Sequence, residues 1–179
     1  MSNDISVEQY EEQYERFQAL KKLKNNMPLF GKHCFPTALR KVTPPFHHEI
    51  YRQLCDEKIP RVLIAAPRGT AKSTVSTLIL PLWKLAFKSS DEDLFIVIIS
   101  ESQAQSVNFL SRIKYHLTQS KKFIDIFGDY GPNTAKRWTH SDIILKNGAR
   151  IIAVGTGQRV RGFIEGDTRP TLIIVDDFE

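Results

Sequence analysis

Short runs of apolar residues along the chain predict its buried strands. Residues 94–99 are continuously apolar and mostly β-branched, and residues 171–175 repeat this pattern, which is typical of strands covered on both faces. A third run, at residues 61–66, is expected to form a strand that leads into a turn of small residues. Residues 142–145 and 149–154 flank an Asn-Gly pair, which predicts a β-hairpin.

Between these runs, apolar residues recur every three to four positions and predict helices. Residues 7–24 carry Tyr14, Phe17 and Leu20 at this spacing, with acidic residues early and lysines late. We expect this helix to pack on the core or on a neighbour, and to end at Met27-Pro28 and Gly31. Further helices are expected at residues 43–56, 72–87, 100–119 and 121–127.

The alternation of strands and helices predicts the fold class. Strand, helix, strand, helix, hairpin and strand follow one another, which indicates an α/β protein with an open, mostly parallel sheet and flanking helices. The chain has 179 residues, enough to bury one sizeable core.

The composition excludes some classes of site and partner but does not identify the partner. A formal net charge of +5 permits a polyanionic partner but does not require one. Cys34 and Cys55 form no C-x-x-C pair, and His47 and His48 are adjacent, so neither a zinc site nor a disulfide framework is predicted. No apolar run reaches the ~20 residues of a membrane span, and no signal peptide is indicated. We expect a protein of a reducing compartment without membrane contact.

The stretch that follows the first predicted strand has the features of a phosphate-binding loop. Lysine and serine arrive at a predicted helix start, where backbone N–H groups and the helix dipole favour an anion. Lys72 is expected to bind the terminal phosphates of ATP, and the Ser73 hydroxyl to hold Mg²⁺. Ala66 and Ala71 stand where the usual G-x-x-x-x-G-K-[ST] pattern has glycine, and alanine costs ~1–2 kcal/mol if φ must be positive there. The predicted nucleotide-binding residues are Ala66, Pro67, Arg68, Gly69, Thr70, Ala71, Lys72, Ser73 and Thr74.

A second group of candidate residues follows the last apolar run. A central strand at residues 171–175 would deliver carboxylates to the edge of the sheet that faces the phosphate loop. Asp176 is expected to share Mg²⁺ with Ser73, and Asp177 or Glu179 to activate the attacking water. The sequence leaves open which of these two acids is the catalytic one, with a slight preference for Glu179.

Arginines form the third candidate group. Arg68 lies within the loop, and Arg159 and Arg161 lie in a glycine-rich segment further along. A guanidinium near the γ-phosphate accelerates phosphoryl transfer by roughly 10³–10⁵. The alternatives for Arg159 and Arg161 are a solvated loop charge or a contact to DNA phosphate.

These motifs, in this order, resemble the ATPase half of a tailed-phage terminase large subunit. The resemblance rests on Ala-Pro-Arg-Gly-Thr-Ala-Lys-Ser-Thr, the Gly-Gln-Arg-Val-Arg-Gly loop and Ile-Ile-Val-Asp-Asp-Phe-Glu, and covers roughly residues 40–179. The segment from Pro44 to Tyr51 resembles the upstream adenine-side element of that family. The resemblance implies a P-loop NTPase of the RecA/helicase-like kind, preceded at residues 1–39 by a helical extension. It also implies that Arg68 senses the γ-phosphate, and that Arg161, or Arg159, acts across a subunit boundary.

The same resemblance implies partners and a place of action. Family members form homo-oligomeric rings with the portal protein and the terminase small subunit, and drive double-stranded DNA into the prohead. They work in the host cytoplasm, transiently at the prohead. The family's nuclease domain has no counterpart in these residues, and the sheet is expected to be incomplete on its C-terminal side. Two other functions stay open: a catalytically silent nucleotide- or DNA-binding module, and a helicase-like remodelling ATPase.

Overall fold

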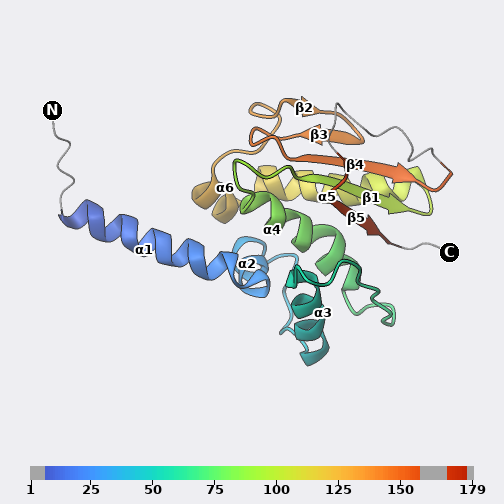
Figure 1. Ribbon diagram of the computed structural model, residues 1–179, viewed down its shortest axis with the longest axis horizontal. Helices are drawn as coiled ribbons and strands as arrows, with labels where there is room; N and C mark the ends of the chain where they lie inside the picture. Colours follow the sequence, from blue (N-terminus) through green and yellow to red (C-terminus); the bar gives the residue numbers. More distant parts are fainter. Residues whose placement is uncertain (1–6, 158–168, 177–179) are drawn as a thin grey trace.

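The computed structural model describes residues 7–157 and 169–176, which form an α/β structure around one open sheet (Figure 1). The sheet has five strands in the order β2-β3-β4-β1-β5. The parallel part consists of β1 (Phe95–Ser100) flanked by β4 (Arg150–Gly155) and β5 (Leu172–Val175). The short strands β2 (Arg137–Trp138) and β3 (Asp142–Ile144) extend the β4 side in antiparallel fashion. The predicted α/β class and the hairpin are confirmed, and the sheet is mixed.

The helices lie close to their predicted positions. Ser102 and Ser120 fix two helix starts, because their side chains accept hydrogen bonds from the N–H groups of Gln105 and Phe123. The helical segments are α1 (Val7–Lys24), α2 (Met27–Cys34), α3 (Pro45–Cys55), η1 (Thr74–Ile79), α4 (Leu80–Ala86), α5 (Gln103–Gln119) and α6 (Lys121–Phe127).

The helix after the candidate phosphate loop contains a π-helical segment. Residues 72–86 are helical throughout, but η1 has π-helical bonding, and the N–H of Leu80 donates to the carbonyl of Val75. Pro81 explains the change, since its ring lacks an N–H and would collide with the carbonyl of Thr77 in a regular α-helix. Such π-helical turns often occur at functional sites.

The two faces of the sheet are packed separately. Ile96 and Ile98 of β1 belong to a large apolar cluster that includes η1, α4, α5 and α2. Phe95 and Val97, on the opposite face, form a smaller cluster with Ile152 and Val154. The described helices therefore cover one face of the sheet, the face that leads up to the candidate loop.

The N-terminal region departs from its prediction at Gly31, while the packing of α1 on a neighbour stays a prediction. Figure 1 shows α1 projecting from the body, and Phe17 is 60% exposed, whereas Leu23 near the end of this helix is buried in the core. Gly31 does not end a helix; it lies inside α2, where an added Cβ would come within 2.7 Å of Leu39 Cδ1. Pro28 is tolerated because it stands in the first turn of α2, where no N–H is needed. α2, which belongs to the predicted extension at residues 1–39, packs into the main core. The predicted division between this extension and a domain that starts at residue 40 stays a prediction.

The prediction of a strand at residues 61–66 is wrong. This segment has no ladder partner among the described residues, and Leu63 is 93% exposed. A groove of about 780 Å³ is lined both by residues 61–64 and by β5, so the two segments do not pair. An apolar run becomes a strand only where a neighbouring backbone completes its hydrogen bonds.

β5 is consequently an edge strand, and the prediction of a central strand covered on both faces is wrong. It pairs with β1 alone among the described strands. Ile173 and Val175 are each 54% exposed on the face that carries Val97. The apolar side chains of Ile173 and Val175 predicted burial, but at this position in the sheet they remain exposed.

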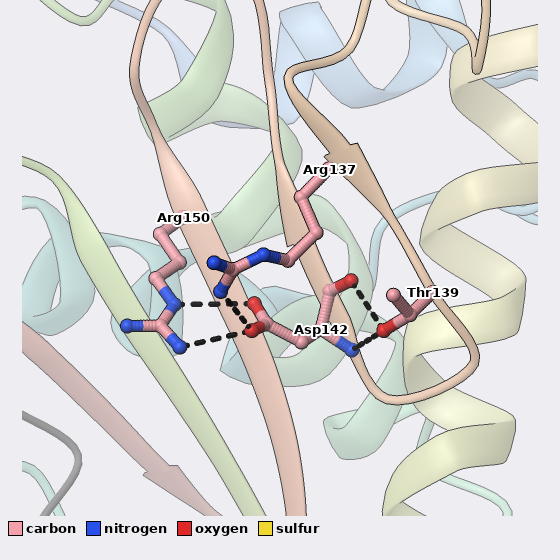
Figure 2. Close-up of polar contacts among 4 residues, drawn as sticks. All are labelled: Arg137, Thr139, Asp142 and Arg150. Carbon is pink, nitrogen blue, oxygen red and sulfur yellow. Dashed lines mark hydrogen bonds and ion pairs between the residues drawn. The ribbon is translucent and has the colours of Figure 1, made fainter. Parts of the chain in front are cut away.

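A cluster of charges fixes the antiparallel side of the sheet (Figure 2). The Asp142 carboxylate accepts hydrogen bonds from Arg137, at 2.7 Å, and from Arg150, at 2.9 and 3.1 Å. The Arg150 guanidinium also lies over the Phe95 ring, 4.8 Å from its centroid. Thr139 closes the β2–β3 turn, since its hydroxyl accepts from Asp142 N–H and donates to Asp142 C=O. One carboxylate thus ties β2, β3 and β4 together.

Asp142→Asn is expected to destabilise the protein by about 1–3 kcal/mol, because the largely desolvated Arg150 and the partly exposed Arg137 lose the charge that they share. Urea unfolding followed by circular dichroism measures the change. Glu49→Gln is the control, since Glu49 pairs with Arg52 on an exposed helix surface, and it should leave the unfolding midpoint unchanged. Equal midpoints for the two variants would contradict a structural role for Asp142.

Candidate functional site

The candidate phosphate loop leaves residues 61–66 and turns sharply into the helix that contains η1. Gly69 has φ +80° and Ala71 has φ +58°, both in the left-handed region. The glycine is therefore required where it stands, whereas Ala71 carries a strain of ~1–2 kcal/mol that a glycine would avoid. Ala66 has no positive φ, so alanine replaces glycine there without that cost. One of the two departures from the usual loop pattern is thus harmless, and the other is strained.

The start of the helix offers unpaired backbone donors. Its first bond runs from Val75 N–H to Ala71 C=O, at 3.1 Å. The N–H groups of residues 71–74 precede this bond and donate to no acceptor among the described residues. Unpaired N–H groups and the positive end of the helix dipole together favour an anion.

A cavity of about 430 Å³ lies beside these donors. Arg68, Gly69, Lys72 and Ser73 line it from the loop and the helix start. Glu101 and Ser102 line it from the segment that joins β1 to α5, and Gln105 lines it from the first turn of α5. The structure thus brings the cationic, hydroxyl and glycine residues of the predicted loop together around one cavity.

The cavity lies where the topology of the sheet favours a ligand. β4 and β5 both follow β1 in the chain but lie on opposite sides of it. The crevice outside the carboxyl end of such a strand is the usual ligand site of open α/β sheets. The sequence motifs did not indicate Glu101, Ser102 or Gln105, although Glu101 could have been indicated by its position directly after the strand β1.

A side-chain amide and a glycine fix the start of α5 against β4. The amide nitrogen of Gln103 donates to the Ala153 carbonyl at 2.9 Å, and its amide oxygen accepts from Gly155 N–H at 2.8 Å. A Cβ at Gly155 would lie only 2.5 Å from the backbone nitrogen of Gln103. This close approach sets the position from which Ser102 and Gln105 reach the cavity.

Helix α3 contacts the loop through one histidine. His47 is 6% exposed, and its Nε2 lies 2.5 Å from the carbonyl oxygen of Thr70. Because a carbonyl only accepts, Nε2 carries the proton in this contact. The Thr70 hydroxyl in turn donates to the Pro67 carbonyl at 2.7 Å, which closes the loop on itself.

Asp176 lies at the end of β5 but does not line the cavity that contains Ser73. It is 8% exposed, and its N–H donates to the Ile99 carbonyl at 3.0 Å. Asp176 lines the groove between residues 61–64 and β5. Lys72 lines both the cavity and this groove, so the two candidate groups meet at that lysine. The predicted sharing of Mg²⁺ by Ser73 and Asp176 stays a prediction.

Four of the predicted catalytic candidates lie outside the described residues. These are Arg159, Arg161, Asp177 and Glu179. The described part of the chain contains no group of three or more His, Cys, Asp or Glu residues that could hold a metal ion.

Comparison with known proteins gives no family assignment: no protein-family model matches the sequence, and no curated protein matches it. Among the described helices, none combines the length and the apolar character that crossing a membrane requires.

Gly155→Ala is expected to displace the start of α5, because the atoms that a Cβ would meet belong to the backbone of Gln103. We expect a loss of stability of about 1–3 kcal/mol and altered amide chemical shifts at Ser102 and Gln105. Gly148→Ala, at the opposite end of β4, is the control: its φ of +81° makes alanine strained, but nothing lies within 4 Å of an added Cβ. The control should lose stability without changing the shifts of Ser102 and Gln105; identical shift patterns would refute the proposed role of Gly155.

Proposed function

We propose that this chain binds the phosphates of Mg-ATP in the cavity at the carboxyl end of β1. The observation that carries the proposal is that Lys72 and Ser73 line this cavity at the start of a helix whose first N–H groups are unpaired among the described residues. Gly69 and Ala71, both at positive φ, shape the backbone immediately before them. Lys72 would contact the β- and γ-phosphates, and Ser73 would bind Mg²⁺.

The charges around the cavity favour a phosphate that brings its own cation. Arg68 and Lys72 supply positive charge, but Glu101 places a carboxylate on the same cavity. A carboxylate repels a bare phosphate and is compatible with one that carries Mg²⁺. We therefore expect the Mg²⁺ complex of the nucleotide, rather than the free nucleotide, to be the preferred ligand.

We further propose that the chain is the ATPase segment of a terminase large subunit that drives DNA into a prohead. The support is the order of the motifs in the sequence, together with an open α/β sheet and the loop geometry at residues 66–74. In this proposal Arg68 senses the γ-phosphate, and Asp176 approaches the metal on binding. The partners would be double-stranded DNA, the portal protein, the small subunit and further copies of the chain in a ring.

A catalytically silent nucleotide-binding module is the second candidate. It is favoured by the observation that Asp176 and Ser73 line different hollows, and that Lys72 alone among the described residues lines both. Measuring ATP turnover with and without DNA separates the two candidates. Turnover that Asp176→Asn abolishes while nucleotide binding persists would support the ATPase. Absence of turnover under both conditions would support the silent module.

Lys72→Ala is expected to weaken Mg-ATP binding about 10- to 100-fold, since a charge-assisted contact to phosphate contributes about 1.5–3 kcal/mol. Titration calorimetry with a non-hydrolysable ATP analogue and Mg²⁺ measures the affinity. Lys41→Ala is the matched control, because Lys41 is exposed and lines neither hollow. An unchanged affinity in Lys72→Ala, or an equal loss in both variants, would rule out the proposed site.

A further inference from the structure

The phosphate site alone does not explain what holds Ala71 in a left-handed conformation. Ala71 is the only residue other than glycine with positive φ among the described residues. A single alanine in this region reverts to negative φ unless its surroundings prevent it. The peptide bond between Thr70 and Ala71 is the place where such a constraint would act.

The direction of this peptide bond and the sign of φ at Ala71 are coupled. The bond is trans, so the Thr70 carbonyl and the Ala71 N–H point in opposite directions. A change of Ala71 to negative φ would rotate this peptide plane, as in the exchange between type II and type I turns. The carbonyl would then leave its present direction, and the Ala71 N–H would turn the other way.

His47 holds that carbonyl. Its Nε2 donates to Thr70 C=O at 2.5 Å, and the side chain is buried between the Phe46 ring, at 4.5 Å between centroids, and the Tyr51 ring, at 6.4 Å. Burial raises the pKa of Tyr51 to about 12, so the ring that faces His47 is uncharged. The backbone N–H of His47 donates to Pro44 C=O at 3.0 Å, within the first turn of α3. The imidazole is therefore a fixed donor rather than a mobile one.

We propose that His47 is a positioning residue of the phosphate loop, which binds the Thr70 carbonyl, keeps Ala71 at positive φ and thereby leaves the Ala71 N–H directed away from α3. Because the Thr70 carbonyl points toward α3, the Ala71 N–H points away from this helix. No residue of α3 lines the cavity. One hydrogen bond and the strain of one left-handed alanine are of similar size, so the contact is sufficient to hold the loop. The consequence for nucleotide affinity rests on the proposed function; the consequence for the conformation of Ala71 does not.

A cycle of four proteins tests the inference: wild type, His47→Leu, Ala71→Gly and the double variant. His47→Leu removes the donor and keeps an apolar side chain, and we expect it to weaken Mg-ATP binding about tenfold, which corresponds to about 1.4 kcal/mol. Ala71→Gly makes positive φ unstrained, so in its presence His47→Leu should cost only about threefold. His47→Gln, which retains an N–H donor, should lose less affinity than His47→Leu. His33→Leu, at an exposed histidine of α2 that lines neither hollow, is the control and should bind as wild type does.

A second readout needs no ligand. The one-bond coupling between the α carbon and the α proton of Ala71 distinguishes positive from negative φ in the free protein, and we expect it to change in His47→Leu and to be preserved in His33→Leu. An unchanged coupling in folded His47→Leu would overturn the inference, as would an equal loss of affinity in the presence and absence of Ala71→Gly. If wild type bound no nucleotide, the proposed function would fail, and the coupling at Ala71 would still decide the role of His47.

Discussion

The packing of two helices against one face of β1 is the constraint on which the candidate site depends. Ile96 and Ile98 anchor that face, and the helix containing η1 and the helix α5 both pack on it. Their starting turns consequently meet at the carboxyl end of β1, and each brings polar groups to the same cavity. The apolar core thus fixes the site, because neither loop could place its polar groups without the helix that follows it.

The sequence was sufficient to predict features that depend only on neighbouring residues of the chain. The loop at residues 66–74 was predicted because glycine, lysine and serine have positions set by nearby backbone geometry, and Gly69 lies at positive φ as that geometry requires. Residues 94–99 are a buried strand as predicted, since both of their faces are covered. Residues 61–66 have the same apolar pattern but no strand partner among the described residues, and a strand depends on that partner. Pattern alone does not reveal which apolar run finds a neighbour.

The remaining features of the site depend on contacts between distant segments. His47 reaches Thr70, and Gln103 reaches Ala153 and Gly155, across separations that no local motif records. Gln105 was missed for the same reason, since it reaches the cavity only through the packing of α5. Asp176 is the opposite case: its motif predicted a metal shared with Ser73, but β5 is an edge strand among the described strands, and Asp176 lines the adjoining groove. Lys72, which lines both hollows, is the residue through which the two halves of a nucleotide site would act together.

The central claim is that the loop backbone and the start of the helix form a phosphate site. The most direct measurement is the change in amide chemical shifts when pyrophosphate and Mg²⁺ are added to the isotope-labelled protein. The account predicts that the largest changes occur at Gly69, Ala71, Lys72 and Ser73, with smaller ones at Ser102 and Gln105. Changes centred on the groove at residues 61–64 and β5, or no change in the loop at saturating pyrophosphate, would contradict it.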